Sequence, residues 1–217
     1  MIKLYSYWRS TAAYRVRLAL NIKQVAYSQH SVHLVKDGGE QHEDEYRDIN
    51  PQGLVPTMVH GEVKISQSLA ILEYLEEKYP QKIALLPENI QLRAFSRQLC
   101  QVIASDVHPL NNLRVLQYLS NSLKVSEKDR MKWYHHWLTL GFDAFSSLLK
   151  EQNFSGPYCL GRELSMADVC LIPQIYNADR FGFSMASYPR LLEINQNCLK
   201  LERFKDAIPE NQPDAER

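Results

Sequence analysis

The 217 residues suffice for one large domain or two modest ones, each with its own apolar core. Hydrophobic residues make up 45% and charged residues 23%, which is the composition of an ordinary globular protein. The 25 Lys and Arg residues balance the 25 Asp and Glu residues, which argues against a nucleic-acid-binding protein with a net basic face. A small anionic ligand stays compatible with this balance, because a few arginines in one pocket can hold it.

The apolar segments and the cysteines indicate in which cellular compartment the protein is expected. The best membrane-span candidate, 169–175, is short and contains Pro173. The chain starts directly in a strand pattern, with no apolar signal region before it. The cysteines form no C-x-x-C pair, so we expect free buried thiols, a cytoplasmic location and no membrane partner; they are Cys100, Cys159, Cys170 and Cys198.

The first eighty residues alternate between strand and helix patterns. Apolar residues alternate in the strand segments and recur at helical spacing in the others. Pro80 stops the last helix, and His60-Gly61 is typical of a tight hairpin turn. The order β-α-β-α-β-β-α predicts a mixed sheet with helices packed on it; the segments are 2–7, 11–23, 26–35, 43–48, 56–59, 62–66 and 66–80.

Strand patterns disappear after this point. Prolines near both ends of 81–89 are typical of a linker, and every later periodic segment is helical: 90–119, 127–151, 166–181 and 191–204. Ser165 and Asp168 have the spacing of a capping box at the start of one helix. We therefore predict a sheet domain over 1–80, a linker over 81–88 and an all-helical domain over 89–217, with a loose tail from Pro209.

A hydroxyl pair marks the junction of the first strand and the first helix. Ser10 and Thr11 lie where free backbone N–H groups and the positive end of the helix dipole favour an anion. A thiolate is such an anion, and Ser10 could donate a hydrogen bond that favours it over the thiol. Simple helix capping by either residue is the alternative interpretation of this segment.

Two further segments suit a peptide-like ligand. Val55 precedes Pro56; if that bond is cis, the turn can leave the Val55 N–H and C=O free for a ligand, whereas a trans bond would make a plain surface turn. At the start of the next helix, Gln67 and Ser68 can hold an amine and a carboxylate, or can serve in capping alone. Together the three segments would suit a small thiol peptide.

The chain resembles zeta-class glutathione transferases over nearly its whole length. The resemblance rests on Tyr5-Ser6-Tyr7-Trp8-Arg9-Ser10 with Tyr14-Arg15-Val16-Arg17, and on the segments 36–39, 50–51, 55–57, 67–71, 108–112, 166–168, 179–181 and 212–214. It implies a thioredoxin-like N-terminal domain with a mixed four-stranded sheet, followed by a C-terminal helical bundle. The family pattern has cysteine where this chain has Ala12 and serine where it has Thr11, which puts side activities in doubt.

The resemblance also implies a cofactor and an activity. The cofactor is glutathione, and the activity is cis–trans isomerisation of maleylacetoacetate to fumarylacetoacetate by thiolate addition, bond rotation and elimination. The catalytic residues would be Ser10, Thr11 and Arg9. The glutathione-binding residues would be Ser10, Thr11, Ala12, Gln41, Val55, Pro56, Gln67, Ser68, His108 and Asn112. A homodimer is implied as well.

The substrate is a dianion, so arginines should hold its carboxylates and the developing enolate. The candidates are Arg9, Arg114 and Arg180, whereas Arg15 and Arg17 are expected to be structural, through ion pairs. Tyr7 is an alternative thiolate partner. The adjacent pair His135-His136 does not share a helix face, and we expect no metal site.

Other functions stay open at this level. Maleylpyruvate is a shorter substrate for the same chemistry, and a general glutathione transferase or peroxidase is a further alternative. A non-catalytic binding module of the same fold is disfavoured, because it has no reason to keep a complete thiol-peptide site. The sequence leaves open whether the pathway is tyrosine breakdown or degradation of an aromatic acid such as gentisate.

Overall fold

The computed structural model describes residues 1–216 and separates into two compact units. One unit consists of residues 1–85 together with the segment that begins at Leu199, and the other consists of residues 86–198. Within the described residues, no helix combines the length and the apolar character that a bilayer span requires.

The first unit is built on a mixed four-stranded sheet, as predicted. The strands are β1 (Ile2–Ser6), β2 (Tyr27–Ser31), β3 (Thr57–His60) and β4 (Val63–Ser66), in the order β2-β1-β3-β4. β1 is parallel to β2 and antiparallel to β3, which is antiparallel to β4. The hairpin turn between β3 and β4 lies at Gly61 and Glu62, one residue later than predicted, and Gly61 has a φ of +63°.

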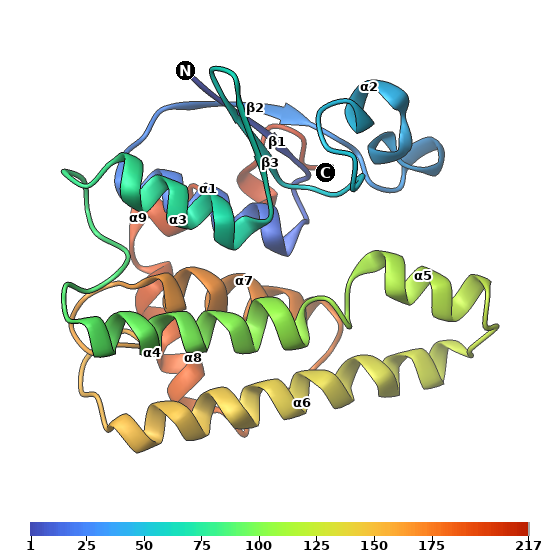
Figure 1. The fold of residues 1–217 in the computed structure, drawn as a ribbon. Helices are drawn as coiled ribbons and strands as arrows, with labels where there is room; N and C mark the ends of the chain where they lie inside the picture. Colours follow the sequence, from blue (N-terminus) through green and yellow to red (C-terminus); the bar gives the residue numbers. More distant parts are fainter. Residues whose placement is uncertain (217) are drawn as a thin grey trace. The chain divides into compact units, whose positions relative to one another are not determined.

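Helices cover the sheet of this unit. α1 (Thr11–Lys23) and α3 (Ser68–Lys78) lie side by side below the sheet in Figure 1, and the short α2 (Asp44–Arg47) lies near the end of β2. α1 and α3 bury apolar side chains, among them Val16, Leu20, Ile71 and Leu75, which are all fully buried. Burial of these side chains is the main source of stability for such a layer.

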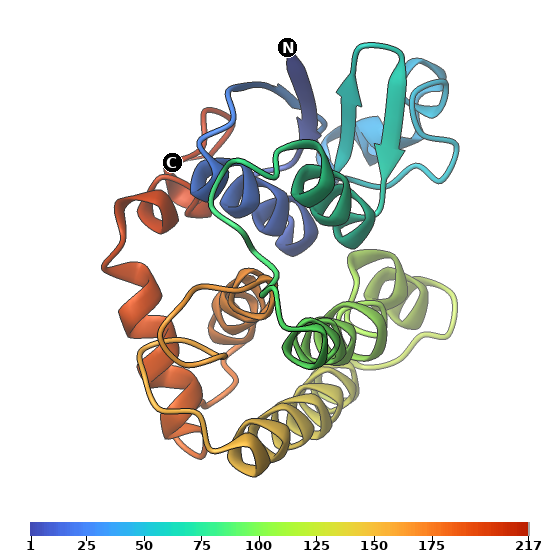
Figure 2. The same ribbon diagram turned by 60° about the vertical axis from the view of Figure 1, so that its left-hand side comes forward.

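The C-terminal segment belongs to the first unit, whereas the predicted division had assigned it to the helical domain. α9 (Glu202–Lys205) packs beside α1 (Figure 2). The Ala207 carbonyl accepts hydrogen bonds from Arg17 Nε and Nη2, both at 3.2 Å. The tail is also less loose than expected, because the buried Gln212 amide donates to the Asp206 and Ile208 carbonyls at 2.9 and 2.8 Å.

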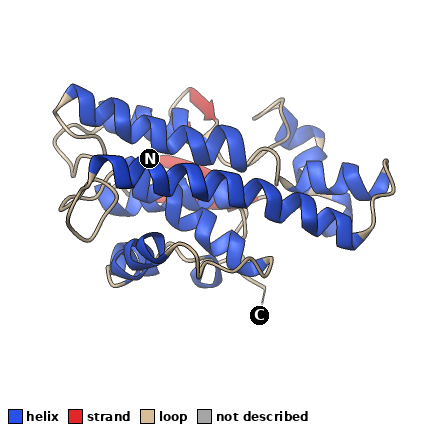
Figure 3. Ribbon diagram, turned by 90° about the horizontal axis from the view of Figure 1, so that it is seen from below, coloured by secondary structure: helices blue, strands red, loops and turns tan. Residues whose placement is uncertain are grey.

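The second unit consists of helices joined by loops (Figure 3), as predicted for this part of the chain. They are α4 (Ile90–Gln101), a π-helical turn (Val102–Val107), α5 (Leu113–Asn121), α6 (Glu127–Gln152), α7 (Met166–Arg180) and α8 (Pro189–Leu199). Gly141 permits close packing of α6, since a Cβ at this position would lie 2.0 Å from Val107 Cγ2.

Two predicted helices are interrupted. The segment 90–119 turns after the π-helical stretch, where Pro109 lacks an N–H for a helix and Asn112 caps the new helix α5. Likewise, 191–204 splits into α8 and α9. Apolar residues recur at helical spacing on both sides of each break, so periodicity alone could not locate the breaks.

The predicted capping box opens α7. The buried Asp168 carboxylate accepts from the Ser165 N–H at 2.8 Å, from Ser165 Oγ at 2.9 Å and from the Cys159 N–H at 2.8 Å. These bonds satisfy amide donors at the start of the most deeply buried helix of the unit.

Candidate active site

Ser10 occupies the junction between β1 and α1. Its Oγ accepts a hydrogen bond from the Ala13 N–H at 3.2 Å, so the residue does cap the helix. The Ser10 N–H donates to the Tyr7 carbonyl at 2.9 Å and closes a tight turn. Because Oγ acts as an acceptor in the cap, the hydroxyl proton stays available to donate to an anion. Capping and anion stabilisation are therefore compatible roles of one side chain.

The side chains around Ser10 differ in exposure. Thr11 is buried, Ala12 is half-buried, and Arg9 is exposed with its guanidinium 4.0 Å from the centroid of the Trp8 ring. Tyr7 is buried and its ring packs edge-on against His33. Arg9 is thus supported by a cation–π contact beside the exposed part of the turn.

Arg17 fixes the backbone of this turn from inside the unit. It is fully buried, and its Nη1 donates to Ser6 Oγ at 3.2 Å. Its Nη2 donates to the Trp8 carbonyl at 3.0 Å. These contacts are hydrogen bonds to a hydroxyl and to carbonyls, and they give Arg17 a structural role at the turn.

The loop before β3 presents free backbone groups. The Val55–Pro56 bond is cis. The preceding Leu54 carbonyl accepts from Tyr46 Oη and Asn50 Nδ2, both at 2.7 Å, which holds the loop in place. Within residues 1–216, no hydrogen bond engages the Val55 N–H or C=O. This half-buried pair can therefore receive a peptide-like ligand.

The start of α3 carries two of the predicted ligand contacts. Gln67 is exposed, has a φ of 71° and a ψ of 114°, and donates from Nε2 to Gln52 Oε1 at 2.9 Å. A non-glycine residue in this backbone region is costly and is typical of functional sites. Ser68 is the first residue of α3, and its buried Oγ accepts from Arg15 Nη1 at 3.2 Å.

Gln41 contributes a buried amide near the loop that precedes β3. Its Nε2 donates to the Leu34 carbonyl at 3.2 Å, whereas its Oε1 is buried and has no partner within residues 1–216. Gly39 has a φ of +103°, which favours glycine, and a Cβ there would lie 2.5 Å from the Gln41 amide. An orphaned buried acceptor is the kind of group that a ligand N–H satisfies.

The predicted residues of the helical unit lie at two places. His108 is half-buried in the turn after α4, Asn112 caps α5 by accepting from the Arg114 N–H at 3.1 Å, and Arg114 is exposed. Arg180 is exposed at the end of α7, where its Nη1 donates to Asn177 Oδ1 at 3.2 Å.

Comparisons with known proteins decide the family. Residues 4–83 match the domain family described as glutathione S-transferase, N-terminal domain. A Vibrio cholerae protein named probable maleylacetoacetate isomerase is 49% identical, with 98% of this chain and 97% of that protein covered. The chain belongs to the zeta-class glutathione transferase family.

Solved structures of this family extend the agreement to the fold. The holo structure of a maleylpyruvate isomerase, described as a bacterial zeta-class glutathione S-transferase, has a TM-score of 0.95 and 39% identity, covering 99% of this chain and 100% of that one. A maleylacetoacetate isomerase from Methylobacterium extorquens with bound malonate and glutathione has a TM-score of 0.93 and 38% identity, covering 99% and 100%. The predicted thioredoxin-like domain and helical bundle are confirmed.

The sequence missed the residues that hold Arg180 in this zeta-class protein. Tyr134 Oη accepts from Asn177 Nδ2 at 2.7 Å, so the Asn177 amide is oriented with its oxygen toward Arg180. Burial raises the pKa of the Tyr134 hydroxyl, and the nearby Arg180 opposes that shift. The spacing of Asn177 and Arg180, three residues apart on one helix, was the available signal.

Consecutive residues of α6 contact both segments of this unit that carry predicted ligand residues, the turn at 108–112 and the end of α7. Trp133 Nε1 donates to the Leu110 carbonyl at 2.9 Å, and Asn111 Nδ2 donates to the Tyr134 carbonyl at 3.0 Å. On the other side, His135 Nε2 lies 2.9 Å from the Phe181 carbonyl. The N-terminal third of α6 therefore fixes both the turn at 108–112 and the end of α7.

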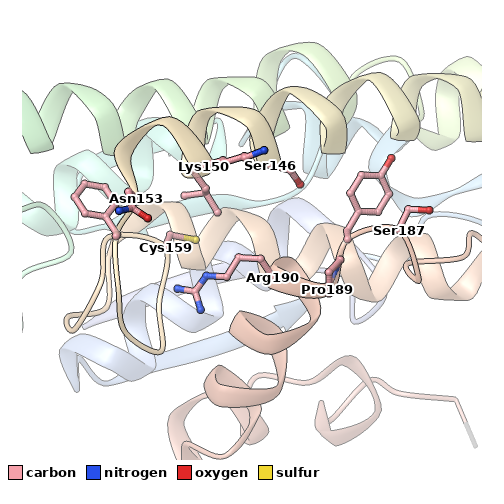
Figure 4. A pocket seen from close by; sticks show the side chains of 10 residues that line it. Ser146, Lys150, Asn153, Cys159, Ser187, Pro189 and Arg190 are labelled. Carbon is pink, nitrogen blue, oxygen red and sulfur yellow. The ribbon is translucent and has the colours of Figure 1, made fainter.

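The helical unit also contains a pocket of about 330 Å³, between the end of α6 and the start of α8 (Figure 4). None of the predicted ligand residues lines it. Its Arg190 is engaged with Glu193 at 2.7 Å and with the Gly156 carbonyl at 2.6 Å, which gives this arginine a role in loop anchoring. Burial raises the pKa of the lining Cys159 thiol, and the Asp168 carboxylate adds to the shift.

The four cysteines lie in the second unit, over residues 86–198. All four cysteines are free and buried, as predicted, and none lies in residues 1–85 or 199–216. Across residues 1–216, no three His, Cys, Asp or Glu side chains gather in a way that could hold a metal ion.

Proposed function

We propose that this protein catalyses the glutathione-dependent cis–trans isomerisation of maleylacetoacetate to fumarylacetoacetate. The observation that supports this proposal most strongly is the Ser10 hydroxyl at the start of α1, whose proton is free to donate a hydrogen bond to a thiolate. The full-length similarity to zeta-class isomerases supports the same reaction.

The residues of the first unit fit glutathione. The thiol would lie at Ser10, Thr11 and Ala12, and the peptide backbone would pair with the free N–H and C=O of Val55 beside the cis Pro56. Gln67 and Ser68 would hold a carboxylate at the N-terminus of α3. The buried Gln41 Oε1 offers an acceptor without a partner in residues 1–216. From the helical unit we assign His108 and Asn112 to the same ligand.

The chemistry requires a nucleophile, because a carbon–carbon double bond does not rotate thermally. When bound, glutathione supplies a thiolate that adds to the activated alkene and leaves again after rotation, without net consumption. Ser10 lowers the free energy of the thiolate by donating its hydroxyl hydrogen bond. The amide N–H groups at the start of α1 add the positive end of the helix dipole, and the buried Thr11 borders this position.

Arginines supply the remaining charge. Arg9 adjoins the thiolate position and is exposed, so it can hold a substrate carboxylate or the developing enolate oxygen. We assign the second carboxylate to Arg180, whose guanidinium is oriented by Asn177, and to Arg114. Such groups act mainly through electrostatic stabilisation of charge that develops in the transition state.

A second candidate substrate is maleylpyruvate. The maleylpyruvate isomerase structure with a TM-score of 0.95 favours it, and two or three arginines suit either dianion. Spectrophotometric assays of both substrates, each with and without glutathione, decide between them. A kcat/KM at least about tenfold higher for maleylacetoacetate supports the proposal, and equal turnover without glutathione overturns it.

We infer a cytoplasmic location from the buried free cysteines. The resemblance to zeta-class glutathione transferases supports a homodimer. If maleylacetoacetate is the better substrate, the protein acts in tyrosine catabolism. If maleylpyruvate is better, it acts in the breakdown of an aromatic acid. Size-exclusion chromatography with light scattering tests the oligomeric state.

A further inference from the structure

The Asp214 carboxylate connects the C-terminal segment to the turn that carries Arg9 and Ser10. Its Oδ2 accepts from the Trp8 N–H at 3.0 Å and from Ser31 Oγ at 3.2 Å. Its Oδ1 accepts from Gln29 Nε2 at 2.8 Å. A single carboxylate thus binds the end of β1, the edge strand β2 and the tail together.

The Trp8 carbonyl is held by a second contact, which also reaches the C-terminal segment. Arg17 Nη2 donates to the Trp8 carbonyl at 3.0 Å and to the Ala207 carbonyl at 3.2 Å. Both the N–H and the C=O of Trp8 are therefore tied to residues after 199, one directly and one through Arg17. The Trp8 side chain is 3% exposed and supports the Arg9 guanidinium at 4.0 Å.

The tail is itself anchored, so it can transmit this restraint. The Gln212 amide donates to the Asp206 and Ile208 carbonyls, and the Ala215 N–H donates to the Gln212 carbonyl at 3.0 Å. Beyond Asp214, the exposed Glu216 Oε1 lies 2.8 Å from His33 Nε2, a contact that does not involve the Trp8 backbone.

We propose that Asp214 is a positioning residue that acts through Trp8 to hold Arg9 and Ser10 in their reactive arrangement. This inference rests on the proposed function, because it takes Ser10 as the thiolate donor and Arg9 as a substrate contact. Removing the carboxylate leaves the buried Trp8 N–H without its charged acceptor and lets the turn relax. Small displacements of a catalytic group lower the rate strongly, by up to about a hundredfold for 1 Å.

The substitutions Asp214→Ala, Asp214→Asn and Asp214→Glu separate positioning from stability. Asp214→Asn keeps the side-chain shape but removes the charge. It replaces the alanine variant as the test if that variant does not fold. Asp214→Glu keeps the charge and should restore most of the activity. Glu216→Ala is the matched control, because this carboxylate is on the same segment but contacts His33 instead of the turn.

The measurements are kcat, the two KM values, the pKa of the thiol of bound glutathione, and amide hydrogen exchange at Trp8. For Asp214→Ala or Asp214→Asn we expect kcat to fall roughly tenfold to a hundredfold, with KM for glutathione changed less than about threefold. The thiol pKa should rise and the Trp8 amide should exchange faster, whereas Glu216→Ala should stay within about twofold of wild type in kcat.

Wild-type kcat and thiol pKa in a folded Asp214→Asn protein would overturn the proposal. Equal losses in Glu216→Ala would also overturn it, since the effect would then belong to the tail in general. The thiol pKa needs only glutathione, and the Trp8 exchange needs no ligand at all. Failure of the proposed isomerisation would therefore leave the positioning of the turn testable by these two measurements.

Discussion

Arg15 Nη1 donates a hydrogen bond to Ser68 Oγ across 3.2 Å, and both side chains are buried. The contact joins α1 to the first residue of α3, two elements that each offer a helix N-terminus to an anion. Because Ser68 Oγ accepts from a fixed cation, its hydroxyl proton is left to donate to a ligand. Ser10 is in the same situation, since its Oγ accepts from the Ala13 N–H. Local contacts thus orient both hydroxyls as donors.

Removing this contact should weaken glutathione binding without abolishing catalysis. For Arg15→Lys and for Ser68→Ala we expect the Kd of glutathione to rise about tenfold, as expected for a lost charge-assisted hydrogen bond. The double variant should lose less binding free energy for glutathione than the sum of the two single losses, because each single change removes the same Arg15–Ser68 interaction. Isothermal titration calorimetry gives the glutathione affinity of wild type, of each single variant and of the double variant. Strict additivity would show that Arg15 and Ser68 act independently.

Arg180 should contribute to the binding of the maleyl substrate, and Asn177 should contribute through it. Arg180→Ala should lower kcat/KM about a hundredfold, and Asn177→Ala about tenfold, while the Kd of glutathione stays unchanged. Arg162→Ala, an exposed arginine of the same unit, is the control. Steady-state kinetics with both maleyl acids measures the effect. An unaltered kcat/KM in Arg180→Ala would reject its role, and Arg9→Ala is tested in the same way.

The order of elements and the sheet type could be predicted because they depend on local periodicity. Strands β1, β3 and β4 and helices α1 and α3 followed alternation or helical spacing closely. The breaks at 108–112 and near 200 could not, since the apolar pattern continues across them. The place of the tail depended on Arg17 and Ala207, which are 190 residues apart. Contacts of that range leave no periodic signal in a single sequence.

The candidate site was predictable only in part for the same reason. Ser10, Val55 and Ser68 lie beside sequence features with a local meaning, namely a strand–helix junction, an X-Pro bond and a helix start. Asp214 and Tyr134 act through distant partners, so neither had a local signature. Arg15 and Arg17 were expected to be structural, and their long-range partners, the Ser68 hydroxyl and the Ala207 carbonyl, could not be read from the local sequence.

The native protein should resist thiol reagents. All four cysteines are buried, and burial raises the pKa of Cys159 and of Cys198, so little thiolate forms. We expect less than about 0.2 equivalents of thiol to react with a disulfide reagent, and no loss of activity with a maleimide. Ala12→Cys should add about one reactive thiol at the start of α1 and make the enzyme activity sensitive to the maleimide. Rapid inactivation of wild type by the maleimide would contradict this.

Four tyrosines should ionise late as the pH rises. Burial raises the pKa of Tyr27, Tyr46 and Tyr134, and it raises that of Tyr188 to about 12, with the Asp143 carboxylate adding to the shift. Since these hydroxyls ionise near 10 once unfolded, stability present below pH 10 should be lost as the pH rises above it. Ultraviolet titration followed with circular dichroism checks this. Complete tyrosine ionisation near pH 10 in folded protein would refute it.

The pKa of the thiol of bound glutathione, measured by thiolate absorbance in wild type and in Ser10→Ala, tests the central claim most directly. In wild type the pKa should lie well below the free-thiol value of about 8.5. In Ser10→Ala it should return toward that value, with kcat/KM reduced about 10²- to 10³-fold, and Ser10→Thr should keep the low pKa. The same low pKa in Ser10→Ala, with turnover retained, would contradict the role of the Ser10 hydroxyl.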